Sequence, residues 1–120
     1  MRKVFFYLMI LVVLTCADKP MSHTETAKEV VESFYNKDNT KLKSNTTPES
    51  YESFLAVQDV MTSENPGASN FEVLEETIEG DVAWVKFQTS YEEKPETFKL
   101  IKVDGRWKVA EMGLREKSSF

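Results

Sequence analysis

The 120-residue sequence is poor in the residues that build disulfides and metal centres, because it holds one cysteine and one histidine. A single cysteine cannot form an intramolecular disulfide, so a folded domain must rest on its own hydrophobic core. Zinc sites need several Cys or His ligands at set spacings, and without a second histidine or a usable cysteine that spacing is absent. Glycine-rich phosphate loops, EF-hand patterns and nucleophile elbows are also missing. We therefore predict no metal and no cofactor.

Positive charge is also scarce: 15 Lys and Arg stand against 20 Asp and Glu, a formal net charge of −5. Proteins that bind nucleic acid need a basic stripe or patch, so the sequence predicts no nucleic-acid partner. An acidic surface is not attracted to anionic lipid either. Any contact with a membrane is therefore expected to depend on an anchor rather than on surface charge.

The longest uninterrupted apolar run is residues 4–14, VFFYLMILVVL, which is eleven residues long. A membrane-spanning helix needs about 20 such residues, so this run is too short to span a bilayer. It follows Arg2 and Lys3, and a short positive region before an apolar run is typical of a secretory signal peptide. We predict that residues 1–15 are a signal peptide.

Cys16 closes this segment, and a lone cysteine at that place resembles the signal of bacterial lipoproteins. The resemblance implies that Cys16 receives acyl chains such as palmitate, that residues 16–21 form a tether, and that the protein is anchored to a membrane of the bacterial cell envelope. Several acyl chains hold a protein firmly on a membrane, whereas a single chain gives only marginal binding. Cleavage before Cys16 also changes the formal charge from −5 to −7. The alternative is a simple cleaved signal with an incidental cysteine, and the choice between inner and outer membrane stays open.

Two helices are predicted in the first half of the remaining chain. Ser22 and Glu25 have the spacing of a capping box, and the apolar residues after them recur with a helical period up to Tyr35. Thr47 before Pro48 is typical of a second helix start. Its apolar side is expected to carry Tyr51, Phe54, Leu55 and either Gln58 or Met61. Asp38 or Asn39 can cap a short helical turn between the two helices, placing Leu42 on the core.

From Phe71 onward the apolar period changes to two, which indicates strands. Gly80-Asp81 and Asp104-Gly105 each predict a two-residue hairpin loop. The first hairpin is expected to pair Leu74 with Phe87, and to place Trp84 beside Lys86 on the opposite face. In the second hairpin, Phe98, Leu100, Trp107 and Val109 share one face. We expect this hairpin to lie in the centre of the sheet.

The predicted order of elements gives an α+β domain over residues 22–113, with N-terminal helices packed on one face of a curved four-stranded antiparallel sheet and a C-terminal tail at 114–120. The segments EVVESFY (29–35), GDVAWV (80–85) and KVDGRWKV (102–109) resemble the nuclear transport factor 2-like superfamily, and within it a family of small bacterial lipoproteins of unknown function. The resemblance implies a cone with one open end and a homodimer formed through the outer sheet face. These motifs are structural, so no reaction follows from them.

Enzymes of this superfamily place an Asp, His or Tyr at the mouth of the cone for proton transfer. Here His23 falls at a helix start, where we expect a solvated side chain, and the aspartates fall at turns and caps. Glu72, Glu76 and Glu111 fall on nominally inward faces, and we assign them to the rim. We therefore predict no catalytic residue.

The favoured function is non-catalytic binding of a small apolar ligand or a protein partner by the lipid-anchored domain. The predicted pocket is lined by six aromatic residues, Phe34, Tyr35, Tyr51, Phe54, Phe87 and Trp107. Two alternatives stay open. One is an enzyme of the isomerase or dehydratase type, and the other is a structural or partner-inhibiting lipoprotein that acts through Trp84 and Lys86 on the outer sheet face.

Overall fold

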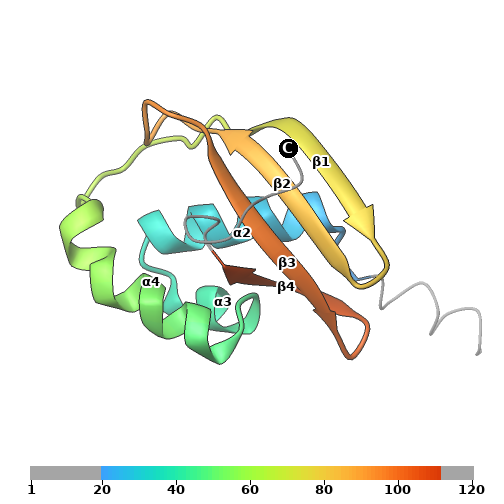
Figure 1. Cartoon of the computed structure of the whole chain (residues 1–120). Helices are drawn as coiled ribbons and strands as arrows, with labels where there is room; N and C mark the ends of the chain where they lie inside the picture. The colour runs from blue at the N-terminus through green and yellow to red at the C-terminus, as the bar shows by residue number, and fades with distance from the viewer. Residues whose placement is uncertain (1–19, 112–120) are drawn as a thin grey trace, which may run out of the picture.

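The computed structural model describes residues 20–111 of the chain (Figure 1). The predicted signal peptide, Cys16 and the tail at 114–120 lie outside this range. The elements are α2 (His23–Tyr35), α3 (Asn39–Ser44), α4 (Pro48–Met61), β1 (Glu72–Glu79), β2 (Val82–Gln88), β3 (Glu96–Val103) and β4 (Arg106–Glu111). Across residues 20–111, no helix has both the length and the apolar character that crossing a membrane requires.

The helices begin where their capping residues predict. The Ser22 hydroxyl accepts a hydrogen bond from the Glu25 amide at 3.1 Å, and the Ser22 amide donates to the Glu25 carboxylate at 2.8 Å, which completes the capping box. Thr47 caps α4 in the same way by accepting from the Ser50 amide at 3.3 Å. Asp38 caps α3, and Leu42 is fully buried as predicted.

The sheet is an open antiparallel meander in the order β1-β2-β3-β4. Both hairpin loops are confirmed, and at the second one Asp104 and Gly105 both have positive φ angles of 51° and 79°, as a type I′ turn requires. The predicted pairing of Leu100 with Val109 is also confirmed. The expectation that the whole last hairpin is central is wrong, because β3 is central and β4 forms an edge of the sheet.

A short segment outside the sheet covers this edge. Thr46 forms a parallel bridge with Val109 on β4. The Val109 amide donates to the Asn45 carbonyl at 2.9 Å, and the Thr47 amide donates to the Val109 carbonyl at 3.0 Å. The connection between α3 and α4 therefore occupies backbone groups that an edge strand would otherwise expose.

The predicted register of the first hairpin holds for Glu75–Glu79 but fails at Leu74. The register shifts between Val73 and Glu75, so Val73 rather than Leu74 pairs with Phe87. Such a bulge adds one residue to a strand and exchanges the faces of the residues beyond it. Val73 consequently packs against the core, whereas Leu74 is exposed.

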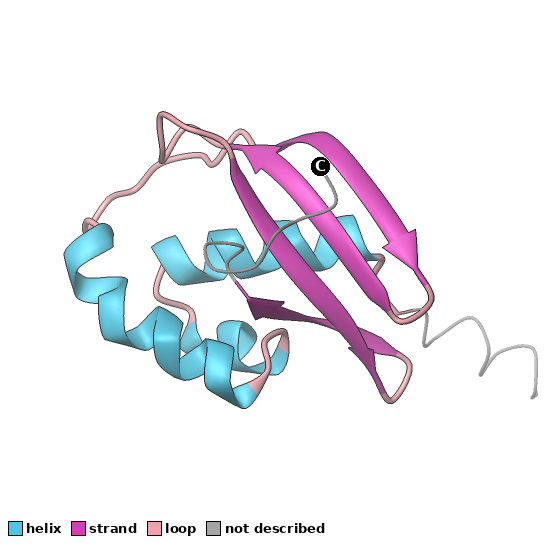
Figure 2. Ribbon diagram, viewed as in Figure 1, coloured by secondary structure: helices cyan, strands magenta, loops and turns pink. Residues whose placement is uncertain are grey.

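The helices lie on one face of the sheet, and α2 crosses beneath it (Figure 2), so the predicted α+β class is confirmed. The predicted apolar face of α2 is buried against the inner residues of β2, β3 and β4. On α4, Phe54 and Gln58 are buried, whereas Leu55, which we expected on the same side, is exposed. The core lies between the helices and the inner face of the sheet, and a hollow is left between α2, α4 and the start of β3.

A candidate ligand cavity at the open end of the cone

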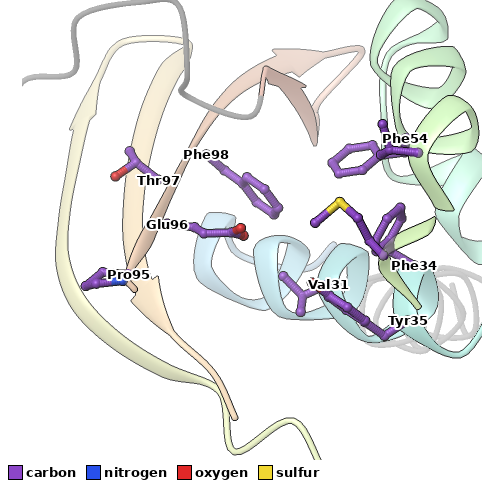
Figure 3. A pocket seen from close by; sticks show the side chains of 10 residues that line it. Val31, Phe34, Tyr35, Phe54, Pro95, Glu96, Thr97 and Phe98 are labelled. Atoms are coloured by element: carbon purple, nitrogen blue, oxygen red, sulfur yellow. The ribbon is translucent and has the colours of Figure 1, made fainter. Parts of the chain in front are cut away.

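The hollow is a cavity of about 390 Å³ between α2, α4 and the start of β3 (Figure 3). Its lining comes from three places in the sequence: Val31, Phe34 and Tyr35 on α2; Phe54, Val57 and Met61 on α4; and Pro95, Glu96, Thr97 and Phe98 at the start of β3. The helical residues recur at intervals of three or four, so each helix presents one stripe to the cavity. The volume falls within the range of about 300–1,000 Å³ that is typical of small-molecule sites.

Aromatic rings form much of the wall. The Phe54 ring centroid lies 5.3 Å from that of Phe34 and 6.0 Å from that of Phe98. Phe34 in turn meets Tyr35 edge-on at 5.0 Å. Tilted and edge-on pairs at these distances are the favourable arrangements for aromatic side chains, so the wall is held by its own packing.

Glu96 is the one charged residue in this lining. It pairs with Phe87 across the sheet, and strand alternation turns Glu96 and Phe98 to the same side (Figure 3). No residue in the described range donates a hydrogen bond to its carboxylate or forms an ion pair with it, and its oxygens keep contact with solvent. Burial raises the pKa of Glu96 above its ordinary value, and the nearby Glu92 carboxylate raises it further.

A second polar group borders the cavity at Tyr35. Its hydroxyl donates a hydrogen bond of 2.9 Å to the Glu92 carboxylate, and its ring stacks on Tyr91 with centroids 4.2 Å apart. The Tyr91 hydroxyl donates to the Gly67 carbonyl at 2.9 Å, which ties this stack to the loop after α4. Burial raises the pKa of Tyr35, followed by its hydrogen bond to Glu92, so the phenol keeps its proton at neutral pH.

The structure brings three of the six predicted pocket residues together, since Phe34, Tyr35 and Phe54 all line the cavity. Phe87 and Trp107 belong to the buried core. Tyr51 lies nearer the N-terminal end of α4, where it packs against the core and borders shallow hollows with α3 residues such as Asn39 and Lys43. The predicted pocket residues therefore include some that line the cavity and others that belong to the buried core.

The sequence reasoning missed the stretch Pro95–Phe98, which supplies the polar side of the cavity. Its alternation of Glu96 and Phe98 was the available signal, because a strand that buries Phe98 must turn Glu96 inward as well. Val31, Val57 and Met61 were also missed as lining residues. Aliphatic residues on a helix give no sign of whether they face packed core or empty space.

His23 lies elsewhere, at the start of α2, and our expectation of a solvated side chain is wrong. Its side chain is only 12% exposed, its Nε2 atom forms a hydrogen bond with the Glu76 carboxylate on β1, and its ring meets Trp107 edge-on at 5.9 Å. Glu76 therefore has a hydrogen-bond partner in His23, and Glu72 and Glu76 are both exposed. Residues 20–111 contain no cluster of three or more potential metal ligands.

On the other face of the sheet, Trp84 pairs with Thr77 as predicted and is 9% exposed. The Lys99 ammonium lies 5.7 Å from its ring centroid, within the range of a cation–π contact. Lys86 forms an ion pair of 3.8 Å with Glu75 on β1. An interface at Trp84 and Lys86 stays a prediction, and so does the homodimer.

No protein-family model matches the chain, and no curated protein sequence matches it. Two crystal structures resemble its fold. The first is of a "putative NTF2-like transpeptidase" from Campylobacter jejuni, with a TM-score of 0.57 and 16% identity, covering 75% of this chain and 99% of the other. The second is of an NTF2-like protein of unknown function from Silicibacter pomeroyi, with a TM-score of 0.57 and 12% identity, covering 72% and 87%.

These likenesses confirm the predicted nuclear transport factor 2-like fold. They do not confirm the finer resemblance to a lipoprotein family, and at such identities they show nothing of the function.

Proposed function

We propose that this chain is a lipid-anchored protein of the bacterial cell envelope whose cone binds a small, largely apolar molecule. The observation that supports binding is the cavity of about 390 Å³, in which nine of the ten lining residues are uncharged and four are aromatic. Apolar walls with a few placed polar groups are the usual composition of small-molecule sites. Glu96 is the group that would orient the ligand.

Binding is tested with the neutral fluorophore prodan, whose emission shifts on entering an apolar site. Val57→Phe adds a ring inside the cavity, and Val60→Phe adds the same ring at an 87% exposed position on the same helix. We expect saturable binding to the wild type and to Val60→Phe, and a loss of about tenfold or more in Val57→Phe, since steric filling removes contacts worth at least 1.4 kcal/mol. Circular dichroism checks that both variants fold. Equal binding by both variants would place the dye outside the cavity and overturn the proposal.

The anchor part of the proposal concerns Cys16, the one cysteine of the chain, at the end of the apolar run 4–14. Intact mass and membrane partition are compared for the wild type and Cys16→Ser, both expressed in a bacterial envelope. We expect the mass of an acylated cysteine in the wild type, and loss of both the added mass and membrane retention in the variant. A freely released chain that begins near Ala17 would make Cys16 incidental.

One observation favours the enzyme alternative. Glu96 is a carboxyl with a raised pKa in an apolar cavity, which is the environment of a general base. Binding ranks first because a base also needs donors for the developing oxyanion, and the Tyr35 hydroxyl already donates to Glu92. The test is deuterium incorporation next to the carbonyl of an unsaturated cyclic ketone in D₂O. Incorporation by the wild type that is lost in Glu96→Gln would establish proton transfer, and equal rates would exclude it.

A further inference from the structure

The cavity carries a charge that nothing in the described chain compensates. No lysine or arginine lines it, and the Glu96 carboxylate has neither a hydrogen-bond donor nor an ion-pair partner among residues 20–111. The nearest charged group that acts on it is a second carboxylate, Glu92. Glu92 has a donor in the Tyr35 hydroxyl, whereas Glu96 has none. The cavity is therefore lined mainly by apolar side chains and has a negative electrostatic potential.

This combination discriminates between classes of ligand. Removing water from a carboxylate costs free energy when no partner replaces the water. A cation placed against the carboxylate offsets that cost. An anionic ligand in the cavity would be repelled by Glu96, and the nearby Glu92 carboxylate would add to the repulsion. A neutral ligand would leave Glu96 uncompensated while it displaces the water around the carboxylate.

The aromatic walls favour the same class. Phe34, Phe54 and Phe98 surround the space into which Glu96 points (Figure 3). Aromatic faces attract ammonium groups, and they also hold the apolar part of an amphipathic molecule. A carboxylate beside several rings is thus suited to a cationic nitrogen on a short apolar body.

We propose that the ligand of this cavity is a small amphipathic amine, with its protonated nitrogen against Glu96 and its apolar part among Phe34, Phe54 and Phe98. This inference rests on the proposed binding function and names its ligand class. The amine supplies the missing hydrogen-bond donor. The restriction to small molecules follows from the cavity volume of about 390 Å³, which lies near the lower end of the range for small-molecule sites.

The test is competition against bound prodan by three probes of nearly equal size and different charge: phenethylamine, phenethyl alcohol and phenylacetate. We expect phenethylamine to compete about tenfold better than the alcohol, because a charge-assisted hydrogen bond replaces a neutral one, and phenylacetate to compete least. In Glu96→Gln the preference for the amine over the alcohol is expected to vanish, with competition measured against that variant's own affinity for prodan. Glu93→Gln, an exposed acid three residues away, is the matched control and should keep the preference.

The outcomes separate the two proposals. If prodan does not bind saturably to the wild type, the binding function itself fails. If prodan binds but the amine and the alcohol compete equally, or Glu96→Gln keeps the preference, the binding function stands and the amine is excluded as the ligand class.

Discussion

The side-chain amide of Gln58 on α4 donates a hydrogen bond of 2.9 Å to the main-chain carbonyl of Phe34, near the end of α2. The same nitrogen donates to the Asn39 side chain at 2.9 Å. The last carbonyls of a helix have no partner within it, and the Phe34 carbonyl also accepts from the Lys37 amide beyond the helix end at 3.3 Å, so Gln58 adds a second donor to it. A polar residue on the inner face of α4 thus fixes the two helices that form the walls of the cavity.

Replacement of Gln58 by Leu is expected to lower the free energy of unfolding by about 1–3 kcal/mol, because it removes two hydrogen bonds, to the Phe34 carbonyl and to the Asn39 side chain, even though the new side chain is apolar. Urea unfolding followed by circular dichroism measures the change. Val60→Leu, on the exposed side of the same helix, serves as control and should change stability by less than about 0.5 kcal/mol. A stabilised Gln58→Leu variant would show that the hydrogen bond contributes nothing.

Glu96→Gln is expected to change the pH dependence of stability. The folded-state pKa of Glu96 lies above its ordinary value of 4.5, so below pH 4.5 the carboxyl is protonated in both states and the substitution has little effect. As the pH rises through the raised pKa, the folded wild type loses stability because it must ionise a partly buried group. The glutamine variant cannot ionise.

The stability difference should therefore grow in favour of Glu96→Gln between pH 4.5 and neutrality. Urea midpoints measured across this range, with Glu93→Gln as an exposed reference, give the comparison. A difference that stays constant with pH would mean that Glu96 is not desolvated in the folded protein.

The contact of His23 with Glu76 joins the start of α2 to β1. Removal of either side chain by His23→Ala or Glu76→Ala is expected to destabilise the fold by about 0.5–1.5 kcal/mol, the usual worth of a hydrogen bond. A double-mutant cycle at neutral pH isolates the pairwise contribution. His23→Ala should also shift the emission of Trp107, which its ring contacts, whereas Glu76→Ala should shift it less. Strict additivity of the two substitutions would contradict a direct interaction.

Both tryptophans should be shielded from solvent in the native protein, since Trp84 is 9% exposed and Trp107 is buried in the core. We expect iodide to quench native fluorescence several-fold less than fluorescence in urea. Light scattering over a range of protein concentrations tests the predicted homodimer alongside. Native quenching as strong as that of the unfolded chain would contradict the burial of the tryptophans, and a monomeric mass at every concentration would contradict the homodimer.

The elements that the sequence predicted well are those with complete local signals. The capping box at Ser22 and the turn at Asp104-Gly105 each specify a backbone conformation within a few residues, and both were found. Phe98, Leu100 and Val109 also follow a strict period, so their burial could be predicted.

What the sequence could not give depends on three-dimensional packing. No glycine or proline marks the bulge near Leu74 in the sequence. The register of β1 shifts there because Val73 packs on the core, and this packing cannot be read from local residues. Whether Gln58 or Met61 completes the inner face of α4 depends on the end of α2, which is 24 residues away in sequence from Gln58. The cavity is still harder to predict from the sequence, because it is a space that the surrounding large side chains leave unfilled.

The pairing of Thr46 with Val109 has a consequence for how the chain assembles. The segment before α4 obtains its backbone partners from the last strand of the described domain, so contacts far apart in sequence must form before α4 is fixed. Topologies that depend on such distant pairings fold slowly, because the intervening loop must close first. A chain that lengthens from its N-terminus during synthesis would therefore hold α4 and the wall of the cavity unsettled until β4 had followed. The cavity would come into existence last, once nearly the whole domain had been made.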